Sequence, residues 1–227
     1  MIGRLSTGIQ GLDELIEGGI KARSIGLVVG EAGTGKSTFA THFLKAGADL
    51  GEVGLYVSVE ESKGKFFDNM RRFGFDLTAL EARGLLIFHK ASVQEMRSFL
   101  DQGMVSFEEY FRDGRVKRVV IDSVTALMLS YGGESSQRGA LMMLFEMLER
   151  WGATVLVTSE SDDGEARFNV GYLVDGIFHL YNRKVGQERV RSIEVLKMRG
   201  TNHSRQEIVY RLGNGGISLY PGEKVLV

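Results

Sequence analysis

The clearest chemical pattern in the sequence is the glycine-rich run at 30–37, Gly-Glu-Ala-Gly-Thr-Gly-Lys-Ser, which matches G-x-x-x-x-G-K-[ST]. Glycines let consecutive backbone N–H groups turn inward around phosphate oxygens, and a following helix adds its positive N-terminal end. In such a run the lysine, Lys36, reaches the β- and γ-phosphates, and the hydroxyl of Ser37 ligates Mg²⁺. A strand pattern at 25–29 precedes the run and a helical pattern follows it, which favours a phosphate loop over a strand-to-helix turn that merely uses glycine. We therefore expect nucleotide phosphates to contact Gly30, Glu31, Ala32, Gly33, Thr34, Gly35, Lys36, Ser37 and Thr38.

A second candidate is the acidic residue that ends the apolar run Arg-Val-Val-Ile-Asp-Ser at 118–123. A strand ending in aspartate places a carboxylate at the carboxyl edge of a parallel sheet, where open α/β sheets bind ligands. With a phosphate loop upstream, we expect Asp122 to hold Mg²⁺ together with Ser37, as a Walker B acid does. The alternative role for Asp122 is a helix N-cap, because Val-Thr-Ala-Leu follows at 124–127.

Two carboxylates follow another strand pattern, Val-Ser-Val-Glu-Glu at 57–61. Hydrolysis of a phosphoanhydride needs a group that orients or deprotonates water opposite the leaving phosphate, and a glutamate at this edge can do so. Strand alternation points Glu60 and Glu61 to opposite sides, and we favour Glu60 because we expect it to be the last strand residue. The alternative is a solvated acidic pair at a helix N-terminus.

Two cations close a late strand pattern in Lys-Met-Arg-Gly-Thr-Asn-His at 197–203. Lys197 and Arg199 are two residues apart, so they share a face of the strand. Their position beside a turn suits phosphate contacts, with Arg199 stabilising transition-state charge in the manner of an arginine finger. The residues alone favour a purely structural interpretation, in which they lie on a solvated edge strand whose lysine discourages aggregation.

The elements that must position these residues alternate between short β-branched runs and longer amphipathic stretches. Strand patterns lie at 25–29, 53–59, 85–88, 116–121 and 154–158, and helical patterns at 36–50, around 66–73, at 93–110 and at 137–151. This alternation predicts a mostly parallel sheet flanked by helices on both faces. Four further strand patterns, at 177–181, 189–198, 207–212 and 217–220, indicate an antiparallel C-terminal extension of the same sheet. We therefore predict an α/β fold with one domain over residues 1–227.

Composition excludes several other classes of protein. The 227 residues include 28 Lys+Arg, 29 Asp+Glu and no Cys, so disulfides and thiolate metal sites are excluded. The four histidines are scattered and give no zinc pattern. The sequence shows no apolar run of the ~20 residues that a membrane span needs, and its first residues show no secretory signal, so we expect a cytoplasmic protein without membrane contact.

Taken together, these segments resemble a KaiC-type ATPase domain of the RecA superfamily. The resemblance covers nearly the whole chain, and Lys-x-Arg-Gly-Thr at 197–201 is its most family-specific element. The other segments that carry it are Leu5–Asp13, the phosphate loop, Val59–Glu61, Val120–Thr125 and Val157–Glu160. The chain holds one such module, so it is similar to a single-domain relative with a RecA-like P-loop ATPase core.

The resemblance implies a ring, usually a hexamer, with ATP and Mg²⁺ bound between subunits and ADP as product. The nucleotide bound by the neighbouring copy would be approached by Lys197, Met198, Arg199, Gly200, Thr201 and His203. The family's paired catalytic carboxylates match Glu60 and Glu61, and its base or ribose contacts match Arg72, Gly213 and Asn214. The implied activity is a regulatory, conformational-switch ATPase that acts on an unidentified protein partner.

One departure from the family bears on the activity. Circadian-clock members autophosphorylate an adjacent Ser-Thr pair, whereas the corresponding stretch at 169–175 reads Asn-Val-Gly-Tyr-Leu-Val-Asp and offers only Tyr172. We therefore expect ATP hydrolysis without clock-type autophosphorylation. The pair at Ser135 and Ser136 is interpreted as part of a polar loop between helices.

The alternative function is a RecA- or RadA-like ATPase of DNA repair or recombination. Its DNA loops would lie near 132–138 and 159–167, and the second carries four acids against one arginine. Such a loop repels a phosphate backbone, and the net charge of −1 argues against a large nucleic-acid footprint, so DNA is not the expected partner. A basic patch could still form from Arg183, Lys184, Arg189 and Arg191, although a solvated strand face is the favoured interpretation.

Overall fold

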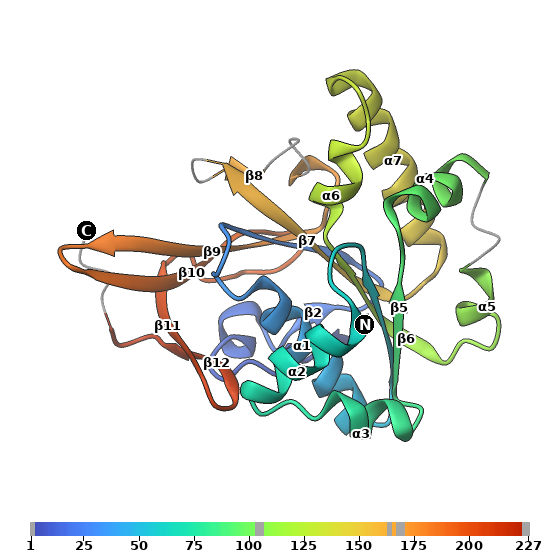
Figure 1. Cartoon of the computed structure of the whole chain (residues 1–227). Coiled ribbons are helices and arrows are strands. Elements are labelled where there is room, and N and C mark those ends of the chain that lie inside the picture. Colours follow the sequence, from blue (N-terminus) through green and yellow to red (C-terminus); the bar gives the residue numbers. More distant parts are fainter. Residues whose placement is uncertain (1–2, 103–106, 163–164, 167–170, 224–227) are drawn as a thin grey trace.

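The centre of the fold is a ten-stranded sheet (Figure 1). The structure is a computed structural model, which describes residues 3–102, 107–162, 165–166 and 171–223. The strand order of the sheet is β12-β11-β10-β9-β3-β7-β6-β4-β5, with β8 paired to β7 outside this path. The strands are β3 (Ile25–Gly30), β4 (Val53–Ser58), β5 (Leu86–Lys90), β6 (Val116–Asp122), β7 (Thr154–Asp162), β8 (Glu165–Ala166), β9 (Gly176–Val185), β10 (Glu188–Met198), β11 (Ile208–Gly213) and β12 (Gly216–Tyr220). A separate two-stranded sheet joins β1 (Arg4–Leu5) to β2 (Ile20–Lys21).

The parallel part of the sheet explains the unbroken apolar runs in the sequence. Strands β5, β4, β6, β7, β3 and β9 pair in parallel, so their carboxyl ends share one edge. Every residue of β3 and β4 is buried, as expected for strands covered on both faces. The predicted mostly parallel α/β sheet is confirmed.

The antiparallel extension is also confirmed, and its first two strands are longer than predicted. Strand β9 pairs with β10, β10 with β11, and β11 with β12, each in antiparallel fashion. The hairpin end of β9 and β10 extends away from the helices, whereas β12 packs against α1 (Figure 1). Polar residues, for example Asn182 and Arg183, continue β9 and β10 beyond their apolar cores. The strand ranges predicted from apolar residues were therefore too short.

Helices cover both faces of the parallel strands and bury two apolar cores. One core lies under α4 (Val93–Gln102), α5 (Glu108–Phe111), α6 (Val124–Leu129) and α7 (Glu134–Arg150). The other lies under α1 (Lys36–Asp49), α2 (Lys63–Arg72), α3 (Leu77–Ala82) and the short helix η1 (Asp13–Ile16). The two groups lie on opposite sides of the sheet (Figure 1).

Three local predictions were wrong. The helix expected over 93–110 is not continuous, because Phe107 lies in a turn between α4 and α5, while residues 103–106 lie outside the described residues. The serines at 135 and 136 lie in the first turn of α7, because that helix begins at Glu134. The DNA-loop position at 159–167 is occupied by strands at 159–162 and 165–166, while 163–164 and 167 lie outside the described residues.

The helices were also compared with the dimensions of a bilayer. Among the described residues, no helix combines the length and the apolar character that crossing a membrane requires.

A buried histidine joins the helix after the phosphate loop to the last strand. His42 of α1 accepts a hydrogen bond from the backbone N–H of Ile217 at 2.8 Å between its Nε2 and that nitrogen. Its ring packs edge-on against Phe75, and only 7% of the residue is exposed. Burial lowers the pKa of His42 to about 4, so the imidazole is neutral near pH 7 and can accept this bond.

Acid is therefore expected to destabilise the fold through His42. The unfolded chain takes up a proton near pH 6.5 whereas the folded chain resists it to about pH 4, so this contribution to stability is complete above pH 6.5 and is lost as pH falls through that window. The loss is on the order of 3 kcal/mol in the free energy of unfolding, measured by urea denaturation between pH 7 and 4. His42→Gln, which keeps an acceptor without titrating, should show a smaller loss over the same range. Equal pH dependence in both proteins would contradict this assignment.

Candidate nucleotide site

The phosphate loop leaves the carboxyl end of β3 and enters α1, as the sequence predicted. Gly33 and Gly35 have φ angles of 78° and 91°, a region that residues with side chains rarely adopt. A Cβ atom on Gly30 would lie 2.4 Å from the carbonyl oxygen of Leu180, because β9 packs closely beside the end of β3. The three glycines thus serve both the turn of the loop and the close approach of the neighbouring strand.

The antiparallel extension holds the loop from behind. Tyr210 of β11 is buried and donates a hydrogen bond from its hydroxyl to the carbonyl oxygen of Thr34. The hydroxyl of Thr34 in turn donates to the carbonyl oxygen of Glu31 at 2.8 Å. Arg191 of β10 donates from Nε to the carbonyl oxygen of Gly33 at 3.4 Å. These contacts fix the loop from a part of the chain that its sequence motif does not include.

Lys36 lies at the opening of the loop. Its Nζ donates to the carbonyl oxygens of Gly30 and Glu31 at 2.9 and 3.0 Å. Burial lowers the pKa of Lys36, and the carboxylates of Asp122, Glu160 and Glu60 oppose that shift. Lys36 is therefore the cation around which the acidic groups of this edge gather.

Ser37 and Asp122 meet as the prediction of a metal site requires. Ser37 Oγ donates to Asp122 Oδ2 at 2.7 Å. Asp122 ends β6 and the N-cap position of α6 is Ser123, so the N-cap role for Asp122 is wrong. A hydroxyl and a carboxylate are the hard oxygen donors that Mg²⁺ takes alongside phosphate oxygens and water, so this pair fits the ion. No group of three or more His, Cys, Asp and Glu side chains forms a metal cage in the described part of the chain.

Two other hydroxyls reach Asp122, and sequence reasoning missed both. Tyr56 of β4 donates to Oδ2, and Thr158 of β7 donates to Oδ1. Burial, followed by the charge of Asp122, raises the pKa of Tyr56 well above its usual value, so the phenol keeps its proton. No motif pointed to either residue, since Tyr56 lies within the apolar pattern of β4 and Thr158 within that of β7.

Glu60 and Glu61 lie in a turn after β4, not in the strand, so the expectation that Glu60 ends the strand was wrong. Glu61 is engaged, since its Oε1 accepts from Asn69 Nδ2 at 2.8 Å. Glu60 is exposed, and partial burial followed by the charges of Asp122 and Glu160 raises its pKa, whereas Lys36 and Lys90 oppose the shift. The helix α2 begins at Lys63 with Ser62 as its N-cap, so Glu61 lies directly before the cap and the alternative of an acidic pair at a helix N-terminus stays open.

A cavity of about 450 Å³ opens beside the loop and extends over α2. It is lined by Gly33, Gly35, Lys36, Ser37, Thr38, Glu61, Asn69, Met70, Arg72, Phe73, Arg191 and Leu212. Arg72, expected near the base or ribose, therefore shares a cavity with the loop. Gly213 directly follows the lining residue Leu212, and Asn214 packs beside Gly74. Loop residues Glu31 and Ala32 are exposed.

Arg191 was expected on a solvated strand face or in a basic patch with Arg183, Lys184 and Arg189, and it lines this cavity instead. Register explains the split, because Arg183 lies opposite Val190 and so faces the other side of the sheet from Arg191. Arg183 forms an ion pair with Glu207. The four cations do not form one patch in the described structure.

Lys197 and Arg199 lie at the opposite end of the sheet from the phosphate loop of their own chain. Met198 pairs with Gly176, which is level with Gly26 of β3, whereas the loop starts at Gly30. Four residues at about 3.3 Å each put this end roughly 13 Å from the loop along the strand. These cations are therefore far from the phosphate loop of their own chain.

The two cations do share a face, as predicted. Lys197 Nζ donates to the carbonyl oxygen of Gly171 at 3.0 Å, and Arg199 Nη2 donates to that of Tyr172 at 3.1 Å. Burial and the charge of Arg199 lower the pKa of Lys197, and Asp175 opposes that shift. The other residues of this segment have different surroundings. Met198 is buried, and Gly200 adopts a φ of 67°. Thr201 Oγ1 accepts a hydrogen bond from Arg4 at 3.0 Å, and His203 Nδ1 lies 2.9 Å from the carbonyl oxygen of Ser204.

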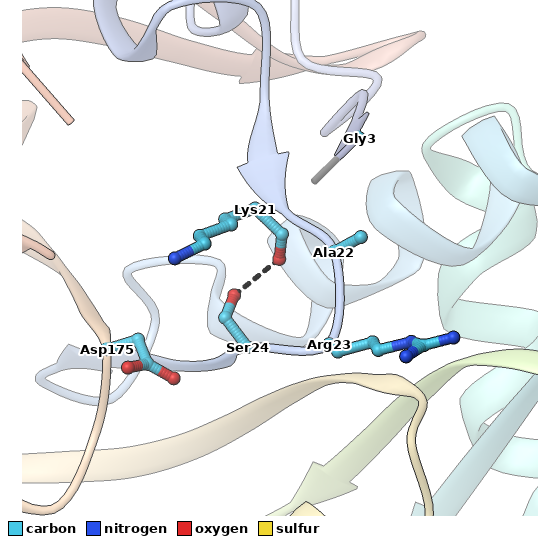
Figure 2. A pocket seen from close by; sticks show the side chains of 6 residues that line it. All are labelled: Gly3, Lys21, Ala22, Arg23, Ser24 and Asp175. Carbon is cyan, nitrogen blue, oxygen red and sulfur yellow. Dashed lines mark hydrogen bonds between the residues drawn. The ribbon is translucent and has the colours of Figure 1, made fainter. Parts of the chain in front are cut away.

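A second cavity, of about 510 Å³, lies at this far edge and is lined by Gly3, Lys21, Ala22, Arg23, Ser24 and Asp175 (Figure 2). Asp175 accepts from the backbone N–H of Ile25 at 3.0 Å and pairs with Arg199 at 3.6 Å. Ser24 donates to the carbonyl oxygen of Lys21 at 2.6 Å, while the side chain of Arg23 extends away from Asp175 (Figure 2). This cavity is separate from the phosphate loop.

Comparisons with known proteins agree with the geometry. The family model described as "ATPase: KaiC" matches residues 5–224. A UPF0273 protein of Pyrococcus furiosus is 35% identical over 242 residues, which cover 100% of this chain and 97% of the relative. The circadian clock oscillator protein KaiC of Parasynechococcus marenigrum is 34% identical over 229 residues, which cover 96% of this chain and 45% of KaiC. The crystal structure of a KaiC-like protein from Pyrococcus horikoshii has a TM-score of 0.87 and 31% identity, covering 97% of this chain and 100% of that one.

The parallel sheet and the loop between β3 and α1 define a P-loop ATPase with a RecA-like core. The match along residues 5–224 and the identity to full-length relatives place the chain more closely: it belongs to the KaiC ATPase family and carries one KaiC-like domain.

The position of Lys36 predicts that nucleotide binding depends on it. Lys36→Ala removes the cation that the loop presents to the β- and γ-phosphates, so ATP affinity measured by calorimetry should fall by at least about 100-fold. Lys45→Ala is the matched control, because Lys45 lies on the same helix and pairs with Asp49 at 2.6 Å away from the loop. Unchanged ATP affinity in Lys36→Ala would remove the loop from the binding site.

Proposed function

We propose that the protein hydrolyses ATP to ADP and inorganic phosphate in an Mg²⁺-dependent reaction. The observation that carries this proposal is the contact of Ser37 with Asp122 beside the loop that holds Lys36, at the carboxyl edge of the parallel sheet, where Glu60 also follows the end of β4. A loop cation, two hard oxygen donors and a carboxylate with raised pKa are the groups that phosphoryl transfer to water requires. Their arrangement within one edge of the sheet supports a single active site.

Each group has a distinct part in the reaction. Lys36 would exchange its contacts with the loop carbonyls for the phosphate oxygens and so offset the charge that develops there. Ser37 and Asp122 would hold Mg²⁺, and the ion would supply positive charge that offsets the negative charge of the phosphates. Glu60 would accept a hydrogen bond from the attacking water and hold it in line with the leaving phosphate. The raised pKa of Glu60 makes it a better proton acceptor than an isolated carboxylate.

The site would be completed by a second copy of the chain. Lys197 and Arg199 lie at the far end of the sheet from their own loop, and a head-to-tail arrangement would bring them to the loop of a neighbour. Such contacts repeat from copy to copy, and they close into a ring when the rotation between neighbouring copies is a whole fraction of a turn. We propose a homo-oligomeric ring, a hexamer as the family suggests, in which hydrolysis changes the conformation that a protein partner meets.

The proposed activity does not include clock-type autophosphorylation. In the stretch 169–175, positions 169 and 170 lie outside the described residues, and the remainder offers one hydroxyl, that of Tyr172. Incubation with labelled ATP is expected to release labelled phosphate without labelling the chain.

Glu60→Gln is expected to keep ATP affinity and to lower kcat by about 10² or more, because the amide holds water without accepting its proton. Steady-state phosphate release measures this change. Glu61→Gln should lower kcat by less than about 10-fold, since Glu61 is held by Asn69. A larger loss in Glu61→Gln than in Glu60→Gln would transfer the role to Glu61.

Mixing two inactive variants tests the contribution of the neighbour. Arg199→Ala keeps a functional loop and Lys36→Ala keeps Arg199, so each should be nearly inactive alone. In equal mixtures, about a quarter of the head-to-tail interfaces combine the intact loop with the intact arginine and should regain turnover. Activity that stays at the level of the separate variants would contradict a shared site.

A further inference from the structure

The carboxylate of Asp122 accepts hydrogen bonds from three hydroxyl groups. Ser37 and Tyr56 donate to Oδ2, and Thr158 donates to Oδ1. A carboxylate offers about four acceptor positions, so the three hydroxyls leave one, and it belongs to Oδ1. The proposed metal site uses Ser37 and Asp122 and assigns no role to Tyr56.

Packing fixes where the Tyr56 hydroxyl lies. Tyr56 is on β4 opposite Val120 of β6, and Ser58, two residues on, is opposite Asp122. Its ring packs against Phe66 at 4.4 Å and Phe88 at 5.6 Å between centroids, and 1% of the residue is exposed. A ring held this firmly cannot withdraw its hydroxyl without repacking the aromatic cluster. The phenol is therefore a fixed donor aimed at Oδ2.

We propose that Tyr56 is a positioning residue that orients the carboxylate of Asp122 toward the Mg²⁺ of the bound nucleotide. Its hydroxyl, with that of Ser37, occupies Oδ2 and so leaves the free acceptor position of Oδ1 for the ion or for a water bound to it. Thr158 completes the arrangement by preventing rotation of the carboxylate from the other side. This inference rests on the proposed function, because it takes Asp122 as a holder of the metal.

An effect on metal affinity is expected because groups that orient metal ligands commonly change it by about 10- to 100-fold when removed. Without Tyr56, Oδ2 regains an acceptor position and the carboxylate has a second orientation of similar energy. The opposing effect is that a carboxylate with fewer donors attracts a cation more strongly. The two effects have opposite signs, so the direction of the change decides between them.

Tyr56→Phe isolates the hydroxyl, since phenylalanine keeps the ring in the aromatic cluster. The full-length variant and the parent are titrated with a fluorescent ADP, once in EDTA and once over a series of free Mg²⁺ concentrations. Affinity in EDTA should agree within about two-fold, whereas the gain in affinity that Mg²⁺ brings should be about 10-fold smaller in Tyr56→Phe. Thr158→Val should change the same gain in the same direction, which keeps the test open if one variant folds poorly.

Two controls separate the possible outcomes. Tyr181→Phe removes another phenol that donates to a carboxylate, that of Glu194 at 3.1 Å, and should leave the Mg²⁺ gain unchanged. Asp122→Asn should abolish the gain, and if it does not, the proposed metal role of Asp122 fails and not merely the part of Tyr56. With Asp122→Asn behaving as expected, an undiminished gain in Tyr56→Phe overturns the proposal. An equal loss of affinity with and without Mg²⁺ also overturns it, because it indicates a purely structural role.

Discussion

The nucleotide site depends on the position of β3 between two parallel neighbours. Gly30, the last residue of β3, lies opposite Glu160 of β7 on one side and Leu180 of β9 on the other. A loop that leaves this point opens between the two strands, so its backbone N–H groups face the edge at which acidic side chains also end. The sheet thus brings together residues that are far apart in the chain, and neither neighbour could be moved without changing the opening.

Positive charges and hydrogen bonds stabilise the carboxylates that gather at this edge of the sheet. Four carboxylates, those of Glu60, Glu61, Asp122 and Glu160, lie near one half-buried lysine, Lys36. Repulsion among them is offset in part by Lys36 and by Lys90, whose Nζ donates to the carbonyl oxygen of Val59 next to Glu60. The three hydroxyls that donate to Asp122 further stabilise its negative charge, by hydrogen bonding instead of by opposite charge. Under the proposed function, such an edge would favour a nucleotide that carries a divalent cation over a nucleotide alone.

Much of this arrangement was predictable from local pattern. The loop at 30–37 and the strand ending at Asp122 are continuous segments whose chemistry follows from residue order, and the structure places Ser37 beside Asp122. The position of Glu60 was less accessible, because the strand ends at Ser58 and both glutamates lie beyond it, where strand alternation no longer fixes the direction of a side chain. Arg191 and Tyr210 could not be found by motif, since their contacts with Gly33 and Thr34 arise from strand order at long sequence separation. Tyr56 resembles an ordinary core residue until its hydroxyl is traced to another strand.

Because Tyr210 holds the phosphate loop in place, the motif at 30–37 alone does not establish a complete nucleotide site. A shortened chain ending before Ile208 would retain every letter of that motif together with Asp122 and Glu60. It would nonetheless lack the phenol that pins Thr34 and the strand that carries it. Nucleotide binding by this protein is thus a property of the complete tertiary structure. A fragment that contains only the motif would be identified as an ATPase from its sequence although it lacks a contact that the site needs.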